Sequence, residues 1–99
     1  RRQQRQRERQ QRQRKTVLVH SAAGGVGLFA CYLCARMGCA VVATVGQPHK
    51  VSFLLERFPQ LLSRRQVIVR ERSAAAFAAQ LDDALLFVQQ QQQQQQQQQ

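Results

Sequence analysis

The chain has 99 residues and a net charge of +10, and its length allows one small domain at most. The charge is concentrated in residues 1–15, which hold eight basic residues and one acid (+7), whereas residues 16–99 hold seven and four (+3). This arginine- and glutamine-rich segment contains no aromatic residue that stacks on bases, so we expect no specific nucleic-acid partner. We predict a disordered low-complexity tail here; a basic arm that binds nucleic acid is the alternative.

The other end of the sequence is also of low complexity, because residues 89–99 are eleven consecutive glutamines. These residues offer no apolar side chain to bury, so we predict a second disordered tail. Residues 16–88 are left to build a core. So short a core is marginal by itself, and we expect this chain to be part of a larger multidomain protein.

Apolar runs and turn residues alternate regularly through residues 16–88. Strands are predicted at short β-branched runs, and helices at longer segments bounded by Gly38, Pro48, Pro59 and Ser73. In chain order, the predicted elements are strand 16–20, helix 26–37, strand 40–45, helix 48–58, strand 66–69 and helix 73–88. Connections of this length require parallel strands with right-handed crossovers, so the fold class is α/β: a partial Rossmann domain of βαβαβα order.

A membrane segment is the alternative for residues 17–35, which are nineteen residues without a formal charge behind a basic stretch. Gly24, Gly25 and Gly27 argue against it, because clustered glycines suit a tight turn and interrupt a spanning helix. We therefore expect no membrane association.

Three cysteines, Cys31, Cys34 and Cys39, lie close together in the sequence. Their spacing raises the possibility of metal or redox chemistry, but no fourth ligand follows at a useful distance. We expect buried free thiols in a reducing compartment, with the cytoplasm as the expected location, and no metal site.

The segment between the first strand and the first helix carries the chemistry. Aligned with G-x-G-x-x-G, its three key positions are Ala22, Gly24 and Gly27. Ala22 is expected to make the tight turn, Gly24 to let a pyrophosphate approach the backbone, and Gly27 to let the helix pack on the strand. The free amides at the helix start then face the phosphates.

The end of the second strand indicates which dinucleotide is bound. NAD-binding domains usually place an acid there for the ribose 2′-hydroxyl, but this chain has Val45-Gly46 and no acid before Glu56. Lys50 follows and is placed to pair with a 2′-phosphate, although it also fits an ordinary exposed lysine in a first helical turn. The sequence therefore predicts NADPH rather than NADH.

These residues resemble a known family. VLVHSAAGGVG at residues 17–27 is similar to the nucleotide-binding segment of zinc-free medium-chain dehydrogenase/reductases, the quinone oxidoreductases among them. ATVG at residues 43–46, Lys50 and ERFPQL at residues 56–61 resemble the enoyl reductase domain of type I fatty acid and polyketide synthases more closely. The resemblance covers about residues 16–77.

The resemblance implies NADPH-dependent reduction of the double bond of an enoyl chain on an acyl carrier protein. It implies cofactor contacts from Lys50 and from Arg72, although one extra residue before Phe77 leaves Arg70 open. The full expected cofactor site is Ala22, Ala23, Gly24, Gly25, Val26, Gly27, Gly46, Lys50 and Arg72. The family's proton-donor lysine and aspartate are expected beyond Val88, so no catalytic residue is assigned. We expect these 99 residues to be inactive alone; a stand-alone NADPH:quinone oxidoreductase fragment is the alternative.

Overall fold

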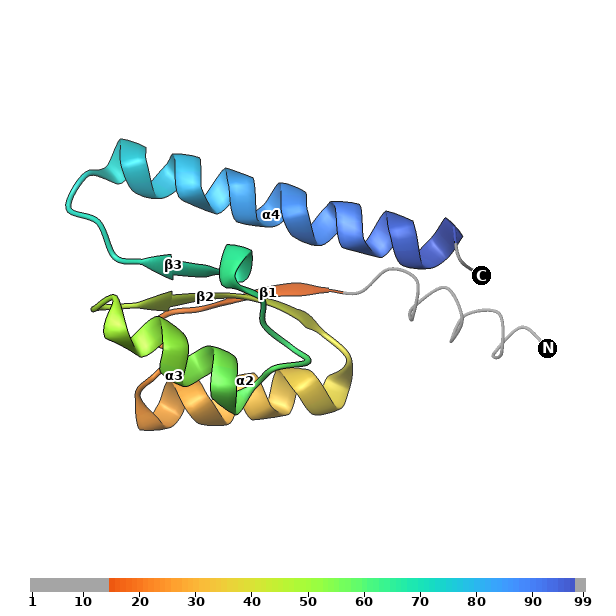
Figure 1. Ribbon diagram of the computed structural model, residues 1–99, viewed down its shortest axis with the longest axis horizontal. Helices are drawn as coiled ribbons and strands as arrows, with labels where there is room; N and C mark the ends of the chain where they lie inside the picture. Colours follow the sequence, from red (N-terminus) through yellow and green to blue (C-terminus); the bar gives the residue numbers. More distant parts are fainter. Residues whose placement is uncertain (1–14, 98–99) are drawn as a thin grey trace.

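The computed structural model describes residues 15–97 and has the predicted α/β fold. Along the chain lie β1 (Thr16–Val19), α2 (Gly25–Met37), β2 (Ala40–Val45), α3 (His49–Arg57), the 3-10 turn η1 (Arg64–Gln66), β3 (Val67–Val69) and α4 (Ala74–Gln97). The three strands form one parallel sheet in the order β1-β2-β3. Figure 1 shows α4 along one face of this sheet, and α2 and α3 on the other. The predicted partial Rossmann architecture is confirmed.

The strands form at runs of β-branched residues, whose side chains can be buried on both faces of a parallel sheet. In β2, all residues after Ala40 are buried, as a central parallel strand requires. Alternate side chains of β2 enter two separate clusters: Val41, Ala43 and Val45 pack toward α2 and α3, and Val42 packs with Ile68 toward α4. The two faces of β2 are therefore both buried, one under α2 and α3 and the other under α4.

The helix boundaries follow the signals in the sequence closely. Gly38 ends α2 in the left-handed conformation, with φ +74°, as predicted. The Ser73 hydroxyl accepts a hydrogen bond from the Ala76 amide at 3.3 Å, so it caps α4. Pro48 stands at the position before α3 rather than inside its first turn, and Phe58 ends that helix ahead of Pro59.

Two predicted strand boundaries needed correction. His20 lies in the turn after β1 and not in the strand, and Gln66 belongs to η1, so β3 begins at Val67. The Gln66 side chain explains the second difference. Its Nε2 donates to the carbonyl oxygens of Val41 and Leu61, while its Oε1 accepts from Ser63, and these bonds hold a tight turn before the strand.

The glutamine run also differs from its prediction. We predicted a disordered tail from residue 89, but α4 continues without a break to Gln97. Ala84 and Val88 are buried against the sheet, so packing has already nucleated the helix before the glutamines begin. Each further glutamine then adds a hydrogen bond to an existing helix, and glutamine is a good helix former. The basic tail predicted at residues 1–15 lies almost entirely outside the described residues.

The cysteines are free, and Cys31 and Cys34 are buried in the cluster under β1 and β2, as predicted for structural thiols. Burial raises the pKa of both thiols, which disfavours the reactive thiolate form. Cys39 is half-buried. None of the helices within residues 15–97 combines the length and apolar character needed to cross a membrane.

Candidate nucleotide-binding site

The candidate site lies where the three parallel strands end. The turn that starts at His20 follows β1, Gly46 follows β2, and Arg70 follows β3. Because the strands are parallel, these three points share one edge of the sheet (Figure 1). The crevice outside the carboxyl ends of the strands is where open α/β sheets bind their ligands.

Gly27 has the packing role predicted for the third position of the motif. A Cβ atom at Gly27 would lie 2.4 Å from the Ser21 carbonyl oxygen and 2.7 Å from the Ala22 Cα, so only glycine fits. This close approach brings the first turn of α2 directly against Ser21 and Ala22 in the turn after β1. Gly24 and Gly25 are exposed; an added Cβ would make ordinary contact at the first and meet nothing within 4 Å at the second. The outer side of the turn is thus open to a ligand.

The tight turn itself depends on a different residue from the one predicted. Ser21, not Ala22, takes the left-handed conformation, with φ 52°. Ala22 is fully buried beneath the turn, and its amide donates to the Thr44 carbonyl oxygen at 2.8 Å. Ala23, next in the chain, is half-buried against the same cluster. Ala22 and Ala23 therefore form the floor of the turn.

The start of α2 is electrostatically suited to an anion. Gly24 occupies the N-cap position, no side chain caps the helix, and its first turn has no acidic residue. The first-turn amides therefore combine with the helix dipole to present positive potential. Val26 is 87% exposed, which leaves the approach to these amides uncovered.

The end of β2 carries the second group of predicted residues. Gly46 is exposed, with open space where a Cβ would stand. Lys50 is half-buried in the first turn of α3, a helix that also lacks a side-chain cap and an acid in its first turn. The structure therefore places Gly46 and Lys50 at the same edge of the sheet as the glycine turn.

Of the two arginines considered, the structure brings Arg70 to the turn. Its amide donates to the Val45 carbonyl oxygen at 2.8 Å, and its Nη2 lies 3.4 Å from the Ser21 hydroxyl oxygen. Arg72 is exposed two residues further on, in the link to α4. The family resemblance favoured Arg72, and one extra residue before Phe77 left Arg70 open. The sequence could not show that the Arg70 guanidinium reaches Ser21.

Thr44 is a residue of the site that sequence reasoning missed. Its side chain is 2% exposed, and its hydroxyl accepts a hydrogen bond from the Ser21 amide at 3.1 Å. The signal was present in the sequence, since Thr44 is the single polar residue in the apolar run at residues 40–45. A buried hydroxyl in a strand needs a partner, and here the partner is the turn.

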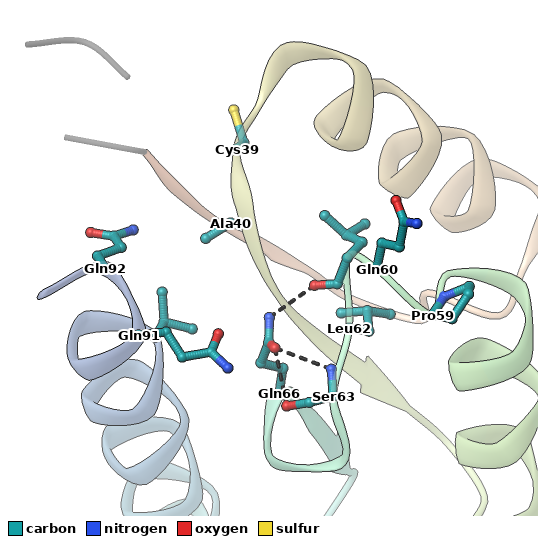
Figure 2. Close-up of a pocket in the computed structure, with 11 residues that line it drawn as sticks. Cys39, Ala40, Pro59, Gln60, Leu62, Ser63, Gln66, Gln91 and Gln92 are labelled. Carbon is teal, nitrogen blue, oxygen red and sulfur yellow. Dashed lines mark hydrogen bonds between the residues drawn. The ribbon is translucent and has the colours of Figure 1, made fainter. Parts of the chain in front are cut away.

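A separate hollow of about 210 Å³ lies at the opposite edge of the sheet (Figure 2). Ala40 and Gln66 mark the amino ends of β2 and β3 there, and Gln91 of α4 forms part of the wall. Figure 2 shows the Gln66 amide directed to Ser63 and to the adjoining loop, so its hydrogen-bonding groups are already used. This hollow is distinct from the glycine turn.

Comparison with known proteins gives short matches to two kinds of enzyme. The chain is 44% identical over 54 residues to a highly reducing polyketide synthase of Alternaria alternata, a match that covers 54% of this chain and 2% of that protein. It is 49% identical over 41 residues to a squalestatin hexaketide synthase of Cochliobolus lunatus, covering 41% and 2%. It is 50% identical over 36 residues to a quinone oxidoreductase of Pseudomonas aeruginosa, covering 36% and 11%.

No family model matches the chain, and no solved structure matches it. The matched stretches are small parts of much longer relatives: 2% of each of the two synthases and 11% of the quinone oxidoreductase. Both kinds of relative are those expected from the glycine turn and the residues that follow it. The predicted resemblance is confirmed: this chain is similar to a short segment of reducing polyketide synthases and of a quinone oxidoreductase.

Proposed function

We propose that residues 16–88 are the NADPH-binding part of an enoyl reductase within a larger polyketide or fatty acid synthase. One observation carries the proposal. The first turn of α2 has no side-chain cap, lies at the carboxyl edge of a parallel sheet, and packs through Gly27 against the turn that follows β1. The similarity to reducing synthases supports the parent protein.

The residues present fit the pyrophosphate of a dinucleotide. Gly24 and Gly25 leave the approach to the α2 amides open, and Val26 follows them in the first turn. Gly46 leaves room at the end of β2 in the same way. We assign the pyrophosphate to the start of α2, above the floor formed by Ala22 and Ala23.

A 2′-phosphate is the feature that separates NADPH from NADH. No acid stands at Val45 or Gly46 to repel it, and Lys50 lies in the first turn of α3. We assign Lys50 to the 2′-phosphate. Two arginines compete for the second contact: Arg72, predicted from the sequence, and Arg70, whose guanidinium already reaches Ser21 at the turn.

The reaction proposed for the parent protein is reduction of the double bond of an enoyl chain held by an acyl carrier protein. Bound NADPH supplies the hydride. The residues of this chain bind and orient the dinucleotide, and none of them is assigned to proton transfer. Substrate contacts and the proton donor are assigned to other parts of the parent protein.

Titration of the full 99-residue chain with reduced nicotinamide cofactors tests the cofactor assignment. We expect NADPH fluorescence to rise on binding, with NADPH bound at least tenfold more tightly than NADH, since one charge-assisted contact contributes about 1.5–3 kcal/mol. Circular dichroism on the same sample establishes that the chain is folded. A folded chain that binds neither cofactor, or both equally, contradicts the assignment.

The two arginines give a second test. We expect Arg70→Ser to weaken NADPH binding about tenfold, the effect of losing one charged contact, because Arg70 adjoins the turn. Arg72→Ser is the matched variant, with the same change in charge two residues away. The NADPH affinities of the two variants, measured by fluorescence titration, show which arginine contributes more to binding. A larger loss from Arg72→Ser would restore the assignment made from the sequence.

A second candidate function is an NADPH:quinone oxidoreductase, favoured by the match to the bacterial enzyme. This candidate would use the same nucleotide site as the enoyl reductase and would differ from it in the substrate. The cofactor titration therefore does not separate the two candidates, whereas neighbouring carrier-protein or ketoreductase domains in the parent gene would identify the synthase. Nucleic-acid binding by the basic tail falls on residues outside the described range and stays a prediction.

A further inference from the structure

Thr44 makes two different contacts with the turn that follows β1. Its hydroxyl oxygen accepts a hydrogen bond from the Ser21 amide at 3.1 Å, and its carbonyl oxygen accepts one from the Ala22 amide at 2.8 Å. One residue of β2 therefore holds two consecutive amides of the turn. The same hydroxyl lies 3.2 Å from Nδ1 of His20, whose ring stacks on Phe77 of α4 at 6.2 Å between centroids.

We propose that Thr44 is the positioning residue of the nucleotide-binding turn, an inference that rests on the function proposed above. Ser21 has φ 52°, a conformation that residues with a side chain rarely adopt unless their surroundings hold them there. The Thr44 hydroxyl supplies that restraint, because a Ser21 amide in any other orientation would lose its partner.

The restraint also determines which amides remain for a ligand. The amides of Ser21 and Ala22 are turned inward to Thr44, and the Gly24 amide donates to the Ser21 carbonyl oxygen at 3.0 Å. The amides of the first turn of α2 have no side-chain cap and are left for a ligand. Thr44 thus acts on the ligand through the turn, without touching the ligand itself.

Replacement of this threonine tests the proposal in the full chain. Thr44→Val keeps the β-branched shape inside the sheet and replaces the hydroxyl with a methyl group, which leaves the Ser21 amide without its partner. Thr44→Ser retains the hydroxyl, and Thr16→Val makes the same chemical change at an exposed position of β1. We expect Thr44→Val to weaken NADPH binding about tenfold, and the other two variants to bind within about twofold of the parent.

Amide hydrogen exchange measured by NMR provides a readout that does not require a ligand. In the parent chain the Ser21 amide should exchange at least tenfold more slowly than an unbonded turn amide. In Thr44→Val this protection should be lost while the β2 amides keep theirs. An unprotected Ser21 amide in the parent chain overturns the proposal, even if Thr44→Val fails to fold.

The two readouts separate failure of this proposal from failure of the proposed function. If the parent chain does not bind NADPH but its Ser21 amide is protected through the Thr44 hydroxyl, the cofactor assignment fails and the positioning role holds. If the parent binds NADPH and Thr44→Val binds it equally well, the positioning role is overturned. Equal losses in Thr44→Ser and Thr44→Val also overturn it, because the hydroxyl would then be irrelevant.

Discussion

Replacing Gly27 with alanine is expected to destabilise the fold by about 3 kcal/mol, since overpacking a closely packed contact typically costs 1–3 kcal/mol. The added Cβ would lie 2.4 Å from the Ser21 carbonyl oxygen and 2.7 Å from the Ala22 Cα. Both atoms belong to the backbone, so neither moves aside by a change of rotamer. The first turn of α2 must therefore shift away from β1. Urea unfolding followed by circular dichroism measures the loss.

Gly25→Ala is the matched control, because it places the same methyl group in the same turn of α2 where nothing lies within 4 Å. We expect its stability to equal or slightly exceed that of the parent, since alanine is the better helix former. Its Cβ would stand on the open side of the turn and is expected to hinder NADPH. Equal stabilities of the Gly27→Ala variant and the parent would refute the packing role.

Reversal of charge at Lys50 is expected to have the largest effect on cofactor choice. We expect Lys50→Glu to weaken NADPH binding about a hundredfold, because the variant replaces an attractive charge-assisted contact of about 1.5–3 kcal/mol with repulsion. NADH lacks the 2′-phosphate, and the new carboxylate can accept a hydrogen bond from its 2′-hydroxyl. The preference should therefore reverse, which paired fluorescence titrations with NADPH and NADH will show.

Lys15→Glu supplies the control for this variant. Lys15 is exposed just before β1, at the opposite edge of the sheet, so the substitution changes the net charge equally and leaves the site untouched. An equal loss of NADPH affinity in both variants would mean that overall charge, and not a contact at Lys50, determines the preference. A parent chain that binds NADPH and NADH equally well would also refute the role of Lys50.

Much of the fold was predictable because local signals and tertiary packing agree. The second strand was predicted at its observed bounds, since its apolar β-branched residues fit a central strand and Gly38 precedes it. The glutamine run was misjudged, because composition predicts how a segment behaves by itself. It does not reveal a helix that buried residues such as Val88 have already begun.

The site was predictable to the extent that it follows a linear motif. Gly24 and Gly27 were located by spacing, and Gly27 has the predicted packing role. Thr44 was not found, and Arg70 was left only as an alternative to Arg72, because their contacts with Ser21 span 23 and 49 residues and depend on strand register. Register is fixed by the pairing of β1 with β2 and of β2 with β3, and no local pattern encodes it.

Because α4 continues into the glutamine repeat, the number of glutamines affects the geometry of the chain. A flexible repeat that gains one residue changes its average reach only slightly, whereas a helix lengthens by about 1.5 Å and turns whatever follows it by about 100°. Since the helix runs unbroken from the residues packed on the sheet to Gln97, repeat number there sets both a distance and a direction measured from the sheet. In two variants that differ by a single glutamine, a segment attached after the repeat would leave the helix in directions that differ by about 100°.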